Sequence, residues 1–166
     1  MSLAAAVAGG FIGTLVLTTT LRGASELGLT RMDIPFLLGT AFSASRSRAK
    51  VIGYALHFAA GLAFSVVYYW IFLAIGRDGW VVGGLLGAVH ALFAGTVLVN
   101  ILLPAMHPRM GTPFSAADSA PLLEPPGFML HNYGRATPVV TLLAHVAYGA
   151  IIGGFVHLAG TRCGPR

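Results

Sequence analysis

Four long apolar stretches dominate this sequence, and none of them contains an Asp, Glu, Lys or Arg residue. They cover residues 3–21, 51–75, 80–103 and 138–159. About 20 helical residues are needed to cross the roughly 30 Å of hydrocarbon in a bilayer. Only helices and closed barrels pair every backbone group there, and the alternating pattern of a barrel strand is absent. The sequence therefore predicts an all-α integral membrane protein with four transmembrane helices.

The composition agrees with a single membrane domain over residues 1–166. Only 9% of the residues are charged and 56% are hydrophobic, whereas a soluble domain carries about 25% charged residues. So few charges cannot cover a surface that faces water on all sides. The net charge of +5 comes from basic residues beside the apolar stretches, which suits anionic lipid headgroups. We therefore expect the lipid bilayer as a partner and no nucleic acid.

The distribution of Lys and Arg predicts the orientation of the chain, because positively charged loops stay in the cytoplasm. The two long loops contain seven basic residues, and the opposite side contains three. The seven are Arg22, Arg31, Arg46, Arg48, Lys50, Arg109 and Arg135, and the three are Arg77, Arg162 and Arg166. We expect a multi-pass protein of the cell (inner or plasma) membrane, with both long loops cytoplasmic and both termini outside.

The two halves of the chain share three segments in the same order, which predicts a tandem repeat over about residues 1–76 and 77–166. GGxxG, RMxxPF and HxxxG segments begin at Gly9, Arg31 and His57 in the first half, and at Gly83, Arg109 and His145 in the second. A repeat of two spans keeps its direction, so the halves would be parallel and related by a pseudo-two-fold axis along the membrane normal. Small residues let membrane helices approach closely. We expect the spans at residues 3–21 and 80–103 to meet near that axis, unless their glycines face other neighbours.

Both cytoplasmic loops contain apolar segments that are too short to cross a membrane. Residues 34–43 form one of them, and residues 120–130 form the other around a Pro-Pro-Gly sequence. Such segments either lie in the headgroup region or dip back into the bundle, or they simply pack over the helix ends. At the opposite interface we expect an aromatic belt that contains Tyr68, Trp70 and Trp80.

Histidines lie inside the predicted spans, where ionisable side chains are costly and usually functional. His57 and His145 occupy equivalent positions, each about 9 Å beyond the cytoplasmic start of its span at 1.5 Å per residue. His90 lies deeper, and His157 lies near the outer surface. Two imidazoles at matched depth can ligate a copper, iron or zinc ion, or the iron of haem b. Alternatively, they only lock the helix packing through hydrogen bonds, or they line a proton or substrate path.

The loop after residue 103 supplies further metal-ligating candidates, although it contains no HExxH or CxxC spacing. Glu124 either pairs with a loop arginine or points inward and completes a carboxylate–histidine site. Gly61, four residues after His57, is expected to leave room for a bulky group. The metal candidates are His57, His145, His90, His107, Glu124 and His131, and the ligand-pocket candidates are Tyr54, Gly61, Tyr148 and Asn132.

Three functions are compatible with these features. The first is a membrane protein whose histidine-lined site in the cytoplasmic half holds a metal ion or haem. The second is an accessory or scaffold subunit of a larger membrane complex, which the glycine-rich faces and the lack of an extramembrane domain favour. The third is a small transporter or channel that acts as a homo-oligomer. No Walker loop and no GxSxG motif is present, so the sequence does not favour an enzyme.

Overall fold

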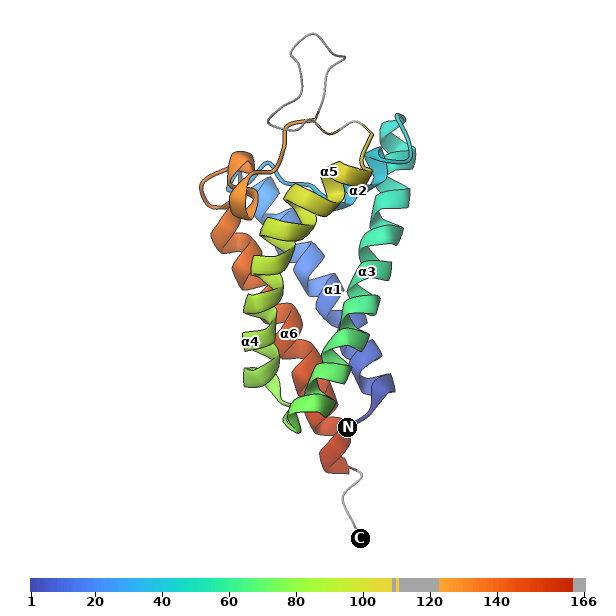
Figure 1. Cartoon of the computed structure of the whole chain (residues 1–166), viewed down its shortest axis with the longest axis vertical. Helices are drawn as coiled ribbons and strands as arrows, with labels where there is room; N and C mark the ends of the chain where they lie inside the picture. The colour runs from blue at the N-terminus through green and yellow to red at the C-terminus, as the bar shows by residue number, and fades with distance from the viewer. Residues whose placement is uncertain (109, 111–122, 163–166) are drawn as a thin grey trace.

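The computed structural model describes residues 1–108, 110 and 123–162, and in this part of the chain it contains helices and no strands (Figure 1). The helices are α1 (Leu3–Glu26), α2 (Ile34–Thr40), α3 (Arg46–Ile75), α4 (Trp80–Phe93), the π-helical segment η1 (Ala94–Leu102), α5 (Leu103–Met106), the 3-10 segment η2 (Phe128–Tyr133) and α6 (Thr137–Arg162). Met110 and Leu123 form an isolated β-bridge. The prediction of an all-helical chain is confirmed over these residues.

Four helices are long and apolar enough to cross a membrane, as predicted. They are α1, α3, α6 and the continuous run formed by α4, η1 and α5. The first two extend beyond their predicted apolar cores, because α1 continues to Glu26 and α3 begins at Arg46. A short turn joins α3 to α4, and Gly76 and Gly79 supply its positive φ angles of 66° and 103°, which residues with a side chain rarely adopt.

The packing of the four long helices differs from the expected contact between the first and third spans. Helix α6 packs along both α1 and α4, and α1 also packs against α3. Helices α1 and α4 do not pack against each other, so the expectation that these two glycine-rich helices meet on an axis is wrong. Their glycines contact other helices. A Cβ atom on Gly83 would overlap the Gly149 carbonyl oxygen, and one on Gly10 would overlap Ser65.

The described parts of both long loops lie at one end of the bundle, and the start of α1 and the end of α6 lie at the other (Figure 1). The first apolar loop segment becomes α2, which Asp33 caps by accepting a hydrogen bond from the Phe36 N–H at 3.0 Å. Helix α2 lies so close to α3 that a Cβ on Gly53 would overlap the Pro35 carbonyl oxygen. This segment therefore folds back onto the helix that follows it.

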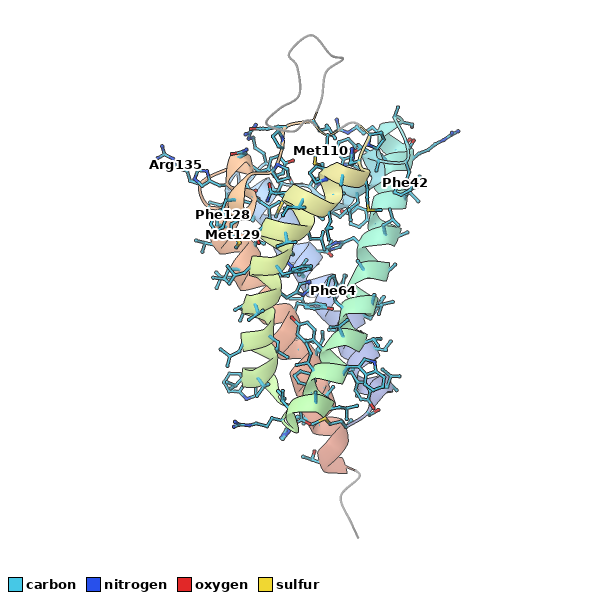
Figure 2. The ribbon with its side chains drawn as sticks, viewed as in Figure 1. Phe42, Phe64, Met110, Phe128, Met129 and Arg135 are labelled. Atoms are coloured by element: carbon cyan, nitrogen blue, oxygen red, sulfur yellow. The ribbon has the colours of Figure 1, made fainter. Side chains whose placement is uncertain are left out.

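The second apolar loop segment is described only from residue 123 onward, so its first three residues lie outside the described part of the chain. The second RMxxPF segment also lies outside the described residues, except for Met110. Figure 2 labels Met110 near the loop end of the bundle. The described part contains η2, where Met129 and Leu130 adopt positive φ angles of 50° and 61°. Both of these side chains are buried, with 5% and 2% of their surface exposed.

Hydrogen bonds tie the first loop to the segment around η2. The Arg31 N–H donates to the Tyr133 carbonyl at 2.7 Å, and the Arg31 side chain donates to the Asn132 carbonyl at 2.7 Å. The hydroxyls of Thr30 and Thr137 lie 2.7 Å apart. Burial and the nearby Glu124 carboxylate raise the pKa of Tyr133 to about 12, although Arg31 opposes this shift. Tyr133 therefore stays protonated at neutral pH and donates to the Glu124 carbonyl at 2.9 Å.

Candidate functional site

A cavity of about 140 Å³ lies inside the bundle, toward the end that carries the long loops. Helices α1, α3, α6 and the α4–η1–α5 run supply its walls, and α2 and Leu130 cover it on the loop side. The residues that line it are Thr14, Leu17, Leu21, Met32, Ile34, Leu37, Leu38, His57, Ala60, Gly61, Phe64, His90, Ala94, Leu98, Val99, Leu103, Leu130, Thr141, His145 and Tyr148. None of them carries a formal charge apart from what the histidines can acquire, so the wall is mainly apolar.

Three histidines predicted as candidates, His57, His90 and His145, line this one cavity. The rings of His90 and His145 meet edge to face, with their centroids 5.0 Å apart. His90 also lies against the Phe64 ring, at a centroid distance of 4.1 Å. The Tyr68 hydroxyl lies 3.4 Å from the His90 Nδ1 atom. Side chains from α3, α4 and α6 therefore form one aromatic and imidazole cluster.

Hydrogen bonds within the protein orient two of the polar side chains. The His145 Nδ1–H donates to the Thr141 carbonyl at 2.8 Å. When the ring is neutral, its Nε2 atom therefore carries a lone pair and can only accept a hydrogen bond. The Tyr148 hydroxyl donates to the Gly61 carbonyl at 2.5 Å and thereby connects α6 to α3.

Two buried polar atoms in the cavity wall have no hydrogen-bond partner among the described residues. They are the His57 Nε2 atom and the Thr141 hydroxyl oxygen. Thr141 is only 1% exposed, so bulk water does not solvate its hydroxyl. A buried hydroxyl without a partner costs about 1–3 kcal/mol, and such groups are rare in folded proteins. Both residues line the cavity.

The other predicted metal candidates do not line the cavity. His107 is buried beneath α2, with its Nε2 atom 3.2 Å from the Thr40 hydroxyl and 3.1 Å from the Leu37 carbonyl. His131 is exposed. Glu124 is also exposed and pairs with Arg31 at 3.4 Å, so it takes the loop-arginine alternative and does not point inward. In the described ranges, no three His, Cys, Asp or Glu side chains come together as metal ligands.

Of the predicted pocket residues, two line the cavity and two do not. Gly61 and Tyr148 line the cavity, whereas Tyr54 lines a smaller one of about 20 Å³ and the exposed Asn132 amide donates to the Pro125 carbonyl at 2.8 Å. The expectation that Gly61 leaves room for a bulky group is wrong, because a Cβ there would overlap the Thr14 hydroxyl. This glycine lets α1 approach α3.

Tyr68 and Phe64 are site residues that the sequence did not identify. Tyr68 was expected in an interfacial belt, but it is only 3% exposed and its ring faces Tyr148 at a centroid distance of 5.6 Å. The signal was present in the spacing, because Phe64 and Tyr68 follow His57 by about two and three helical turns on the same face. Comparison with protein families, with curated proteins and with solved structures finds no match to this chain.

Two threonines one turn apart on α6 are expected to respond oppositely to the same substitution. Thr141→Val removes a buried hydroxyl that has no partner in the described structure, so it should stabilise the ligand-free protein by about 1 kcal/mol. Thr137→Val removes a hydroxyl that bonds Thr30, so it should destabilise the protein by about 1–2 kcal/mol. Equilibrium unfolding in mixed micelles measures both changes. Equal losses for the two variants would show that the Thr141 hydroxyl does have a partner.

Proposed function

We propose that this chain is a multi-pass membrane protein that binds a small, uncharged, largely apolar molecule in the histidine-lined cavity. The membrane assignment is supported by the outer surface of the long helices. Trp80, Leu85 and Val139 are 70%, 66% and 58% exposed, and a water-soluble monomer rarely exposes such a continuous apolar belt. Charged residues gather at the two ends of the bundle. The excess of basic residues in the long loops supports a cytoplasmic location for that end.

The tandem repeat is part of this proposal. In each half, the first long helix packs against the second, as α1 does against α3 and α4 does against α6. Glycines make both contacts close, because a Cβ on Gly10 would overlap Ser65 and a Cβ on Gly83 would overlap Gly149. The equivalent histidines of the two halves line the same cavity. A duplicated two-helix unit accounts for these shared features, and the site would then form between the halves.

The observation that carries the ligand proposal is a pair of polar atoms without a hydrogen-bond partner among the described residues, His57 Nε2 and Thr141 Oγ1, which belong to residues of a mainly apolar wall. Ligand sites are typically apolar, with a few polar groups that orient the ligand. Among the described residues no Asp, Glu, Lys or Arg lines the cavity, so a charged ligand would lack a counter-ion in a low-dielectric interior. The volume of about 140 Å³ is close to the roughly 150 Å³ of an engineered cavity that binds benzene. A single ring with one hydroxyl or carbonyl group matches this size and chemistry.

A metal ion is the second candidate, and the His145 geometry favours it. Metal-bound histidines usually donate their other N–H to a carbonyl or carboxylate, as His145 does to the Thr141 carbonyl. His57 Nε2 offers a second nitrogen without a partner among the described residues. An ion bound by these two atoms would need further ligands from outside the described set. Haem is not proposed, because a porphyrin is several times larger than a benzene-sized cavity.

Two matched probes test the first candidate, since 4-fluorophenol and 4-fluorotoluene differ by a hydroxyl in place of a methyl group. In lipid nanodiscs, fluorine NMR titration should show saturable binding of 4-fluorophenol to the wild-type protein. His57→Leu should weaken that binding about fivefold, because a hydrogen bond contributes about 1 kcal/mol, and it should not weaken the binding of 4-fluorotoluene. His157→Leu is the control, because His157 bonds Asp78 outside the cavity.

Other results of this titration would decide against the small-molecule proposal. Non-saturable partitioning of both probes, equal to that in empty nanodiscs, would contradict it. Stoichiometric metal in the purified wild-type protein, lost in both His57→Leu and His145→Leu but retained in His157→Leu, would establish the metal candidate instead.

A further inference from the structure

The cavity borders a seam where two neighbouring helices fail to pack. Helices α3 and α4 follow each other through a short turn, yet neither α4 nor η1 packs against α3 along its length. The corresponding contact on the other side of the bundle, between α1 and α6, is extensive. In a bundle of two parallel repeats these two contacts would be equivalent, so the chain keeps one of them closed and the other open.

Aromatic side chains bridge the middle of this seam. Phe64 on α3 contacts His90 and lies 6.5 Å from the Phe93 ring on α4, measured between centroids. Figure 2 shows Phe64 between the ribbons of α3 and α4. Phe93 is 39% exposed on the outer surface, whereas Phe64 is partly buried and lines the cavity. Phe64 therefore stands between the cavity and the outside of the bundle.

Small and flexible side chains line the seam on the loop side of Phe64. Ala60 on α3 is exposed and also lines the cavity. Ala94 and Leu98 line the cavity from η1. The Asn100 side chain holds η1 in place, donating to the carbonyls of Thr96 at 3.1 Å and Gly127 at 2.9 Å. Functional sites often contain π-helical turns, and here the turns form one edge of the seam.

Two other routes to the cavity are closed by buried side chains of the described residues. At the loop end Met32, Leu37 and Leu130 are 3%, 7% and 2% exposed, and they cover the cavity on the side that we assign to water. Between α1 and α6, a Cβ on Gly13 would come within 2.9 Å of the Tyr148 ring, so this contact leaves no gap. The seam between α3 and η1 faces the lipid if the bundle spans a membrane.

We propose that the ligand is a molecule dissolved in the bilayer, and that it enters the cavity sideways through the seam formed by Ala60, Phe64, Ala94 and Leu98. The proposal rests on the binding function proposed above. It narrows the ligand to compounds that partition into hydrocarbon. It also assigns Phe64 and Ala60 to the control of access, whereas His57 and Thr141 orient the bound molecule.

Two adjacent alanines on α3 provide the test. Ala59 and Ala60 are both exposed, but only Ala60 lines the cavity. Ala60→Phe should slow the exchange of 4-fluorophenol measured by fluorine NMR in nanodiscs, and Ala59→Phe should not. We expect the association rate to fall by about tenfold, which needs only about 1.4 kcal/mol of extra barrier. The association rate is the diagnostic quantity, because Ala60 also lines the cavity and a phenyl group there alters the bound state as well.

A second pair of variants covers the case in which Ala60→Phe fails to fold. Ala60→Cys and Ala59→Cys, each combined with Cys163→Ala, can be labelled with N-ethylmaleimide after purification. The bulky group is then attached to a protein that has already folded. Entry through the seam is supported if labelling slows the exchange of 4-fluorophenol in the position-60 variant and not in the position-59 variant. Unchanged exchange in the position-60 variants, with acceleration in Leu130→Ala, would overturn lateral access and leave the binding function intact. Absence of saturable binding in the wild type would instead contradict the binding function itself.

Discussion

Gly149→Ala is expected to destabilise the folded protein by about 2–3 kcal/mol, among the largest effects of any single methyl group in this chain. Helices α4 and α6 approach so closely that a Cβ on Gly149 would overlap the Gly83 carbonyl oxygen and come within 3.0 Å of the Gly87 Cα atom. Backbone atoms cannot rotate away as a side chain does, so the helices would have to separate. Small residues at such crossings determine how closely membrane helices pack.

The same substitution should also weaken ligand binding. His145 lies one turn before Gly149, and its ring meets that of His90 from α4. Separating the two helices would pull these rings apart and widen the cavity. Equilibrium unfolding in mixed micelles and the 4-fluorophenol titration measure the two consequences.

Gly154→Ala is the matched control on α6, because no heavy atom of the described residues lies within 4 Å of its added methyl group. Alanine favours a helix over glycine by up to about 1 kcal/mol, so this variant should be as stable as the wild type or slightly more stable. If Gly149→Ala behaved like Gly154→Ala, the close packing of α4 on α6 would be wrong.

Gly53→Ala is expected to release α2 from α3, at a cost of about 2–3 kcal/mol to that contact. A Cβ on Gly53 would overlap the carbonyl of Pro35 in the first turn of α2. Ile34, Leu37 and Leu38 of α2 line the cavity, so moving this helix would open the cavity on the loop side. Hydrogen exchange of the α2 amides should accelerate, while the amides of α6 should keep their protection.

Gly23→Ala serves as the comparison for this variant. Gly23 lies in α1 near the same end of the bundle, and within the part of the chain that the structure describes no heavy atom lies within 4 Å of its added methyl group. Its exchange pattern should match that of the wild type. Uniform acceleration across α2 and α6 in Gly53→Ala would show that α2 is not a separate unit, and unchanged exchange would show that it does not pack on α3 as described.

The four long helices could be predicted from the sequence because their signal is local. An uninterrupted apolar run of more than 18 residues predicts a spanning helix without knowledge of its neighbours. The helix ends were less predictable. Arg46 and Glu26 belong to helices although they interrupt the apolar pattern, because a helix continues past the hydrocarbon wherever its backbone can still bond to itself.

The candidate site could be predicted in part. The equivalent positions of His57 and His145 pointed to one location, and both histidines line the same cavity together with His90. His107 could not be placed, since its partner Thr40 is more than 60 residues away in the chain, whereas Glu124 takes the predicted pairing with a loop arginine, Arg31. Nor could the sequence show that the Thr141 hydroxyl has no partner among the residues that the structure describes.

The sequence by itself determined that the chain folds into four apolar helices of spanning length, because helix formation and lipid solubility depend on residues within one segment. The tertiary structure decided which helices meet. GGxxG predicts a close contact without naming the partner, and only the packing shows that Gly83 contacts Gly149 while α3 and α4 stay apart. The cavity results from that packing. It is the space between helices that remains because α4 and η1 do not pack against α3, while α6 packs closely on α1 and α4.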